Sequence, residues 1–262
     1  MKSSSLSFPA SLPWLQLLVI DLPKNTPLDF PHGLTIYFSA LETLALQNTD
    51  FEPLQRILVS APKLVKLALC CIHSNSDVLS RISWSGSKVN EVKLRIDTDL
   101  RQEEYQWLFT PLEDRLHSLD LSEGVGTTTD FVGSILTQIG STLSRLRLTD
   151  AKDKEIMKKI KQQCIKLDYL VYEGGPDFDW IDLPPTVTRV EALLILDLDM
   201  EGLLDALASS EWLPRLAHLP RITQWPGPEI SAEMRGTALA LAKKRGLCID
   251  NEDQFLVART SV

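Results

Sequence analysis

Metal binding and catalysis need His, Cys, Asp, Glu or Ser side chains at particular spacings, and this chain offers few such groups. No Gly-x-Ser-x-Gly, phosphate-binding-loop or Gly-x-Gly-x-x-Gly pattern is present. The four histidines are scattered without the spacing of metal ligands: they are His32, His73, His117 and His218. We therefore expect no metal site, no cofactor, no catalytic residues and no enzymatic activity.

The cysteines also argue against a metal site and against a disulfide scaffold. Cys70 and Cys71 are adjacent, so on a strand they should point to opposite faces and cannot bind one metal ion together. Cys164 and Cys248 complete a set of only 4 cysteines in 262 residues. We expect reduced thiols packed in the core of an intracellular protein.

Two aspartates form the most suggestive acidic motif. The segment 193–199 resembles the nucleophile strand of haloacid-dehalogenase phosphatases, in which the first Asp (here Asp197) attacks phosphorus and the second (Asp199) protonates the leaving group. Glu201 stands where that family has Thr or Val. The same residues begin like an EF-hand loop, but Ala208 replaces the bidentate Glu that calcium needs. We expect a buried strand followed by a helix, with Asp199 as its cap.

A leucine pattern dominates the chain. Leucine accounts for 45 of the 262 residues, and Leu-x-x-Leu-x-Leu recurs, for example from Leu41 to Leu46 and from Leu143 to Leu148. Four matches are complete, and variants extend the series at intervals of 20 to 27 residues. The triplets start at residues 15, 41, 64, 89, 116, 143, 167, 187 and 213.

Each triplet alternates apolar and polar residues, as a strand with one buried face does. Helices are expected between the triplets, because apolar residues recur there at helical spacing and polar residues suited to capping precede several segments. The expected helices are 51–58, 77–82, 102–112, 129–139, 154–163 and 201–208, and the expected caps are Asp50, Ser76, Thr128 and Asp153. Residues 174–186 are expected to form a loop, with Asp177, Asp179 and Asp182 around Trp180 either solvated or in contact with a partner.

These triplets resemble the leucine-rich-repeat family. The resemblance implies an α/β fold, a curved solenoid with parallel strands on the concave side and helices on the convex side. The expected organisation is an N-terminal lead-in over 1–14, about nine repeats over 15–228, and a C-terminal cap over 229–262. The cap should contain a helix over 229–245 that ends at Gly246, and an edge strand over 247–249.

The segment Leu241-Ala-Lys-Lys-Arg-Gly-Leu-Cys-Ile249 resembles the closing segment of fungal leucine-rich-repeat proteins of the F-box type. That resemblance implies substrate recognition for a ubiquitin ligase. Such proteins dock a Skp-type adaptor through an N-terminal F-box, and no recognisable F-box precedes the first repeat at Leu15.

The residues that flank the middle leucine of each triplet should point to the concave face, where a partner would bind. These positions, with the next one along the strand, hold seven basic and four acidic residues by our assignment, although the net charge of the whole chain is −8. Arginine suits bidentate recognition of carboxylate or phosphate. The alternative is that opposite charges pair across neighbouring strands. The candidate partner-binding residues are Lys66, Lys93, Arg95, Asp120, Arg145, Arg147, Tyr169, Arg189 and Arg215.

Composition limits the partner and the compartment. An acidic chain lacks the basic footprint that nucleic acid or an anionic membrane requires, so we expect neither as a partner. Pro9 and Pro13 interrupt the approach to the apolar run over 15–20, and only Lys2 supplies positive charge, so we expect no signal peptide and a cytoplasmic or nuclear location. The leading hypothesis is a protein-interaction module that binds an acidic or phosphorylated protein segment. The alternative is a structural scaffold that uses its convex or loop surface and has no role in ubiquitination.

Overall fold

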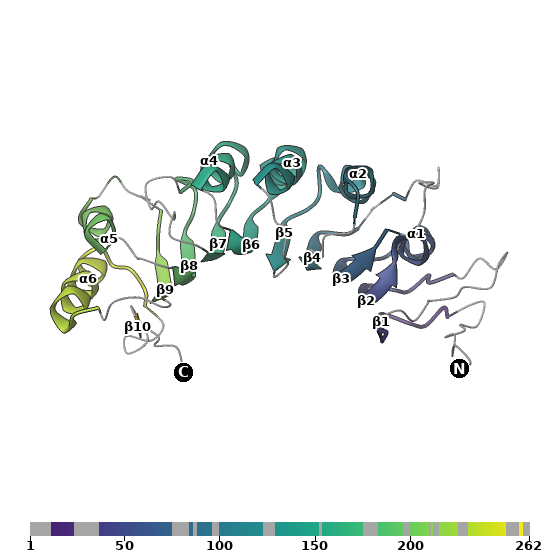
Figure 1. Ribbon diagram of the computed structural model, residues 1–262, viewed down its shortest axis with the longest axis horizontal. Coiled ribbons are helices and arrows are strands. Elements are labelled where there is room, and N and C mark those ends of the chain that lie inside the picture. The colour runs from purple at the N-terminus through teal and green to yellow at the C-terminus, as the bar shows by residue number, and fades with distance from the viewer. Residues whose placement is uncertain are drawn as a thin grey trace. The chain divides into compact units, whose positions relative to one another are not determined.

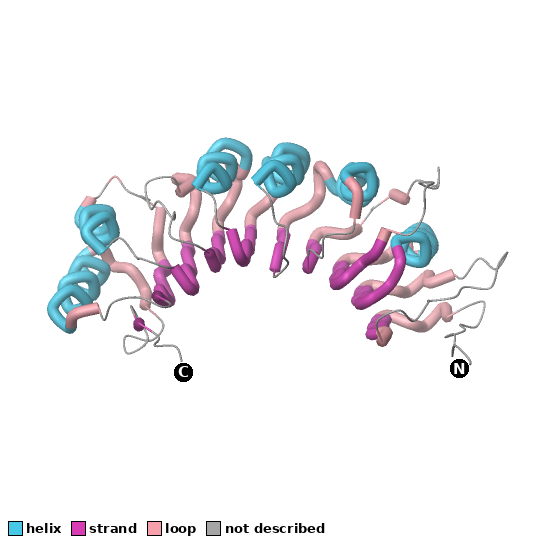
Figure 2. Tube along the Cα trace, viewed as in Figure 1, coloured by secondary structure: helices cyan, strands magenta, loops and turns pink. Residues whose placement is uncertain are grey.

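The computed structural model describes residues 12–23, 37–74, 84–85, 88–95, 100–122, 129–151, 154–174, 183–195, 200–209, 211, 215–224, 230–249 and 257–258. The chain divides into two compact units, an N-terminal unit over 1–126 and a C-terminal unit over 127–262. Each unit has parallel strands in chain order, with its helices gathered on one side of them (Figures 1 and 2). The expected α/β class is therefore confirmed.

Among its described residues, the N-terminal unit contains five parallel strands, and strands that follow one another in sequence are neighbours in space. Leu44, Leu67, Val92 and Leu119 pair in one row across four strands. The elements are β1 (Leu17–Asp21), β2 (Thr43–Asp50), α1 (Phe51–Ser60), β3 (Lys66–His73), β4 (Glu91–Arg95), α2 (Gln102–Phe109), the short helix η1 (Thr110–Leu112) and β5 (Ser118–Ser122).

The C-terminal unit repeats this arrangement. Leu146, Leu170 and Val190 pair in one row across three strands. The elements are α3 (Thr129–Ile139), η2 (Gly140–Thr142), β6 (Arg145–Ala151), α4 (Lys154–Gln163), β7 (Tyr169–Gly174), β8 (Arg189–Ile195), α5 (Met200–Ala208), β9 (His218–Gln224), α6 (Ala232–Lys244) and β10 (Val257–Ala258).

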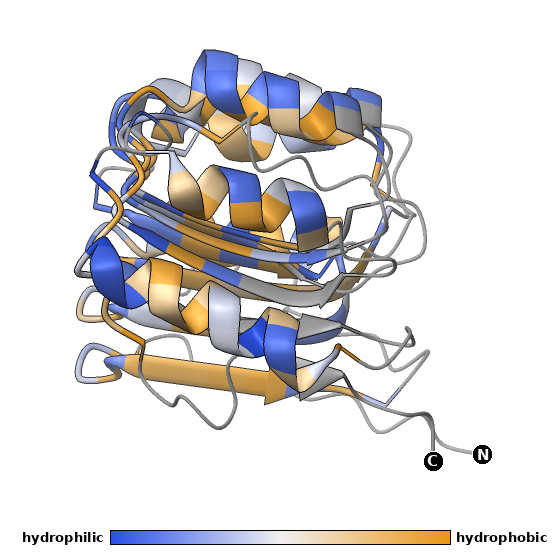
Figure 3. Ribbon diagram, turned by 90° about the vertical axis from the view of Figure 1, so that its left-hand side faces the viewer, coloured by the Kyte–Doolittle hydropathy of each residue, from blue (hydrophilic) through white to orange (hydrophobic). Residues whose placement is uncertain are grey.

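The core of both units is built from the triplet residues. Leu41, Leu44 and Leu46 are at most 2% exposed, and so are Leu143, Leu146 and Leu148. Between strands, helices such as α4 bury one side, with Ile156, Met157 and Ile160 fully covered. Figure 3 shows apolar and polar segments on the same helices, as expected where only one side of a helix is buried.

Eight of the nine triplets predict the strands with a constant offset, because β1 to β8 each begin two residues after a triplet start. The ninth start, at residue 213, is wrong by three residues. Arg215 lies in a turn, and β9 begins only at His218, which pairs with Arg189. Pro220 follows, and the register between β8 and β9 shifts beside it. Proline has no N–H for the ladder, so an irregularity is expected there.

Five of the six expected inter-triplet helices are confirmed, with α3 and α4 at the expected bounds and the others within three residues. The expected helix over 77–82 lies outside the described residues, as do the caps Ser76, Thr128 and Asp153. Asp50 occupies the N-cap position of α1 as expected, but its side chain makes no cap hydrogen bond.

The C-terminal segment begins with a well-capped helix. The Ser231 hydroxyl accepts a hydrogen bond from the Met234 N–H at 3.1 Å, so α6 starts three residues later than expected. Gly246, with φ of 72°, ends the helix as expected, with N–H groups of Gly246 and Leu247 bonding back to Lys243 and Ala242. In place of an edge strand over 247–249, Cys248 forms a single bridge with His218, and β10 pairs with the end of β9.

The expectation that Cys70 and Cys71 point to opposite faces is wrong. Cys71 has a φ of 51°, and the two sulfur atoms lie 3.5 Å apart. A residue in the left-handed region interrupts the alternation of a strand, because its side chain no longer follows the pleat. The expectation of buried thiols holds for Cys164 alone, since Cys70 and Cys71 are half-buried and Cys248 is exposed.

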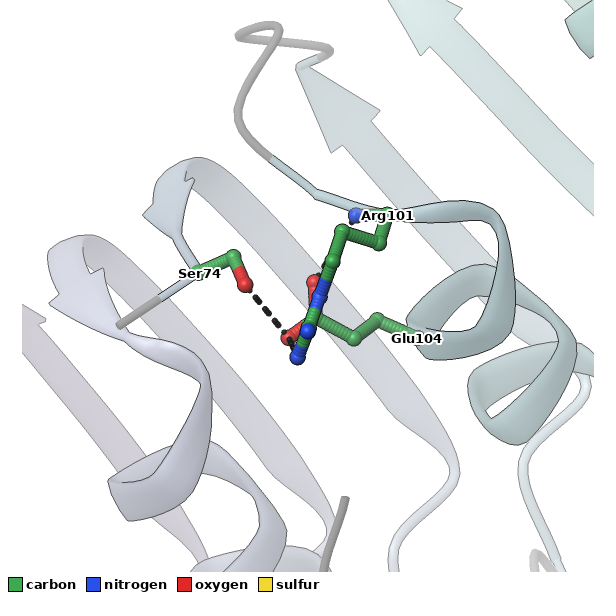
Figure 4. A network of polar contacts seen from close by, with 3 residues as sticks. All are labelled: Ser74, Arg101 and Glu104. Carbon is green, nitrogen blue, oxygen red and sulfur yellow. Dashed lines mark hydrogen bonds and ion pairs between the residues drawn. The ribbon is translucent and has the colours of Figure 1, made fainter. Parts of the chain in front are cut away.

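A buried carboxylate fixes the start of α2. Glu104 is fully buried, and its carboxylate accepts hydrogen bonds from the Arg101 backbone N–H and the Ser74 hydroxyl, both at 2.8 Å (Figure 4). The Arg101 guanidinium lies 3.3 Å from the same carboxylate. Since Ser74 directly follows β3, this cluster ties the helix to a strand that lies about 30 residues earlier in the chain.

Replacing Glu104 with alanine should remove this tie and the helix cap together. We expect the free energy of unfolding to fall by about 2–3 kcal/mol, measured by urea unfolding. Gln106→Ala changes an exposed residue of the same helix and should alter the free energy of unfolding by less than about 0.5 kcal/mol. Equal stability of the two variants would contradict the role of Glu104.

Candidate protein-binding surfaces on the strands

The exposed positions of the strands form a surface on the side away from the helices. In the N-terminal unit the charges on this surface pair across strands. Lys66 Nζ lies 3.0 Å from Glu91 on the next strand, and Lys93 Nζ lies 3.7 Å from Asp120. Both lysine side chains are about half exposed. Exposed ion pairs of this kind stabilise a fold by at most about 1 kcal/mol. A more strongly binding anion could therefore replace the acidic partner of either lysine.

The N-terminal unit also has a groove on this surface, which the sequence analysis missed. It has a volume of about 290 Å³ and crosses β1 to β4. Val19, Ala45, Ala68 and Lys93 occupy one row across the four strands. The small side chains of Ala45 and Ala68, which lie side by side, leave the hollow. These two alanines are the feature of the sequence that could have indicated a groove. The groove is lined by Val19, Ile20, Asp21, Ala45, Leu46, Gln47, Ala68, Leu69, Cys70, Lys93 and Arg95.

In the C-terminal unit, a tyrosine ring lies between two arginines. Arg145, Tyr169 and Arg189 occupy one row across β6, β7 and β8. The guanidinium carbons of Arg145 and Arg189 lie 4.9 Å and 4.8 Å from the centre of the Tyr169 ring. Such cation–π contacts contribute about 0.5–1 kcal/mol each at exposed sites. The Arg145–Tyr169–Arg189 row is therefore a pre-arranged cluster.

Acidic residues orient parts of this cluster. The Tyr169 hydroxyl donates a hydrogen bond to Glu191 Oε2 at 2.9 Å, and Arg147 Nη2 donates one to Glu173 Oε1 at 2.7 Å. Arg147 is therefore already engaged by a carboxylate. Arg145 is exposed, and within the described part of the chain no carboxylate lies at ion-pair distance from it.

The environment of Tyr169 keeps its hydroxyl protonated. Burial raises the pKa of Tyr169 above 10.0, and the hydrogen bond to Glu191 and the charge of that residue raise it further. The positive charges of Arg189 and Arg145 act in the opposite direction and do not prevail. At neutral pH the hydroxyl is thus a fixed donor to Glu191.

The sequence-predicted site residues separate into three groups. Lys66, Lys93 and Asp120 lie in cross-strand ion pairs of the N-terminal unit, and Arg95 lies beside them on the groove. Arg145, Arg147, Tyr169 and Arg189 gather on β6 to β8, as their register predicts. Arg215 does not join them, because it lies in the turn before β9.

Beyond these surfaces, the described residues contain neither a candidate metal site nor a candidate membrane span. Among those residues, no group of three or more His, Cys, Asp and Glu side chains could hold a metal ion. Asp197 and Asp199 lie outside the described residues, as do Asp177, Asp179 and Asp182. None of the described helices is both long enough and apolar enough to cross a membrane.

Comparison with protein-family models and with curated proteins gives no match for this chain.

Replacing Glu191 with glutamine should lower the pKa of Tyr169, because the negative charge that opposes phenolate formation is lost. The phenolate absorbance, taken as the difference between each protein and its Tyr169→Phe counterpart, measures this pKa. In the wild-type chain Tyr169 should titrate above 10.0. Because the Tyr169 pKa is higher in the folded chain than in the unfolded chain, the neutral hydroxyl stabilises the fold at pH values below the pKa of the unfolded chain. This stabilisation is lost as pH rises through the Tyr169 pKa of the folded chain.

Glu173→Gln is the matched control, because Glu173 pairs with Arg147 and not with Tyr169. It should move the Tyr169 pKa less than Glu191→Gln does. A wild-type Tyr169 that titrates at or below 10.0 would contradict the described environment.

Proposed function

We propose that this chain is a leucine-rich-repeat solenoid that acts as a protein-interaction module without enzymatic activity. Its partner is an acidic or phosphorylated protein segment, bound on the strand surface of the C-terminal unit. The regular triplets, whose strands begin two residues after their starts, support the repeat type. The four cysteines form no disulfide bond in the structure, which fits the expected cytoplasmic or nuclear location.

The observation that carries the proposal is the Arg145–Tyr169–Arg189 row. Arg145 stacks on a ring that its neighbours hold in place, yet it is exposed and has no carboxylate partner among the described residues. A guanidinium held in this way loses little side-chain freedom when it binds, so more of its interaction energy appears as affinity. Its planar donor edge matches a carboxylate or a phosphate. Tyr and Arg are also the residues that most often dominate binding energy at interfaces.

A role for this binding in a cellular process is inferred from the resemblance of the closing segment to that of F-box-type proteins. We propose that the chain selects substrates for ubiquitination, as the receptor half of a ligase. Affinity purification of the tagged chain, followed by quantitative mass spectrometry, tests this part separately. Recovery of a Skp-type adaptor and a cullin is expected, and recovery of other proteins without them would contradict the ubiquitination role.

The cross-strand ion pairs favour a second candidate function. Lys66, Lys93 and Arg147 are already paired with acidic side chains. If Arg145 also serves only to order the surface, the chain is a structural scaffold that binds through its helices or loops. The two candidates differ in whether Arg145 contributes to binding.

Replacing Arg145 with alanine separates the two candidates. The probe is an array of acidic peptides, each in phosphorylated and unphosphorylated form, with Kd then measured for the tightest binder. We expect Arg145→Ala to weaken that binding at least about tenfold, which corresponds to ~1.4 kcal/mol.

Lys158→Ala provides a control with the same change of charge. Lys158 lies exposed on α4, where it pairs with Glu155, so its loss should leave Kd unchanged. An equal effect of both variants would indicate that only net charge matters. Unchanged binding by Arg145→Ala would favour the scaffold.

A further inference from the structure

The strand β3 carries two thiols in an unusual arrangement. Cys70 and Cys71 are adjacent, yet their sulfur atoms lie 3.5 Å apart. Side chains of neighbouring strand residues normally point to opposite faces. The cause is the backbone of Cys71, whose φ of 51° lies in the left-handed region.

The fold, not the cysteine, sets this backbone conformation. Asn48 has a φ of 54° on the neighbouring strand β2. The register pairs Gln47 with Cys70 and Thr49 with Ile72, so Asn48 and Cys71 are equivalent positions. Asparagine tolerates the left-handed region well, and the Asn48 side-chain amide donates a hydrogen bond to the Leu22 carbonyl at 2.8 Å. Cysteine has no such preference, so its presence at position 71 needs another explanation.

We propose that Cys70 and Cys71 form a reversible redox site, a dithiol that closes to a disulfide between adjacent residues. The two S–H bonds break and one S–S bond forms, which releases two protons and two electrons. A peroxide can accept them: one thiolate attacks hydrogen peroxide to give a sulfenic acid and water, and the second thiolate attacks that sulfur to release another water. A low-molecular-weight thiol returns the pair to the dithiol by exchange.

The geometry makes such a disulfide easy to reduce. The Cα atoms of adjacent residues are about 3.8 Å apart across a trans peptide, whereas ordinary disulfides join Cα atoms about 4.4–6.8 Å apart. The bond would therefore be strained, and strained disulfides are the labile ones. This site is consequently a switch and not a structural cross-link.

Cys70 and Cys71 are both more exposed than Cys164, which is buried. Cys70 and Cys71 are half-buried, and Cys70 lines the groove across β1 to β4. Burial raises the pKa of Cys164 to about 12, so that thiol is unreactive at neutral pH. Closing the ring would draw the Cys70 sulfur from 3.5 Å to about 2.05 Å from its neighbour. Oxidation would thus alter the lining of the groove.

Mass spectrometry of the full chain after peroxide treatment tests the proposal. Alkylation of the remaining thiols and tryptic digestion give a peptide over 67–81 that contains both cysteines. We expect this peptide to lose alkylation at both residues and the mass of two hydrogen atoms, and to recover fully with a reducing agent. Cys164 in the folded chain should stay reduced under the same treatment.

Cys71→Asn is the matched variant, because it retains the backbone preference seen at Asn48 and removes one sulfur. Its circular dichroism spectrum should match that of the wild type, and its Cys70 should form only sulfenic acid or a mixed disulfide. The proposal is overturned if the wild-type peptide carries separate oxidation on each cysteine. It is also overturned if Cys70 or Cys71 forms an intermolecular disulfide on a non-reducing gel.

Discussion

One strand and one helix cannot cover their own apolar face, and the rest of this structure follows from that constraint. Each triplet is buried only because the next strand places its own triplet alongside, as Leu44, Leu67 and Val92 do. Burial therefore requires constant register from strand to strand. The same register aligns the exposed positions into rows, so residues 20 or more positions apart in sequence become neighbours.

These rows decide which side chains can act together. In the C-terminal unit, the register places Arg145, Tyr169 and Arg189 in one row, where both guanidinium groups stack on the tyrosine ring. In the N-terminal unit, it pairs Lys66 with Glu91 and leaves a hollow over Ala45 and Ala68. The surface chemistry is thus a consequence of core packing. A change of one residue in register would exchange the buried and exposed sets.

The sequence predicted what depends on periodicity and failed where local backbone geometry departs from it. The triplets located eight strands, but the ninth strand begins three residues later than its triplet predicts, so Arg215 lies before it. Strand alternation predicted that Cys70 and Cys71 point to opposite faces. The positive φ of Cys71 breaks this alternation, and the residue type gives no sign of it, because cysteine does not favour the left-handed region. The pairing of Arg147 with Glu173 and of Tyr169 with Glu191 depends on side-chain conformations that spacing does not specify.

In the proposed function, a partner contacts the strand surface of the C-terminal unit at the Arg145–Tyr169–Arg189 row. Hydroxyl-radical footprinting of the chain, with and without its bound partner, tests it most directly. We expect the partner to lower the oxidation of Tyr169, whereas Ile165, which is exposed after α4, should keep its oxidation rate. Unchanged oxidation of Tyr169, together with protection of exposed residues on α3 to α5, would contradict it.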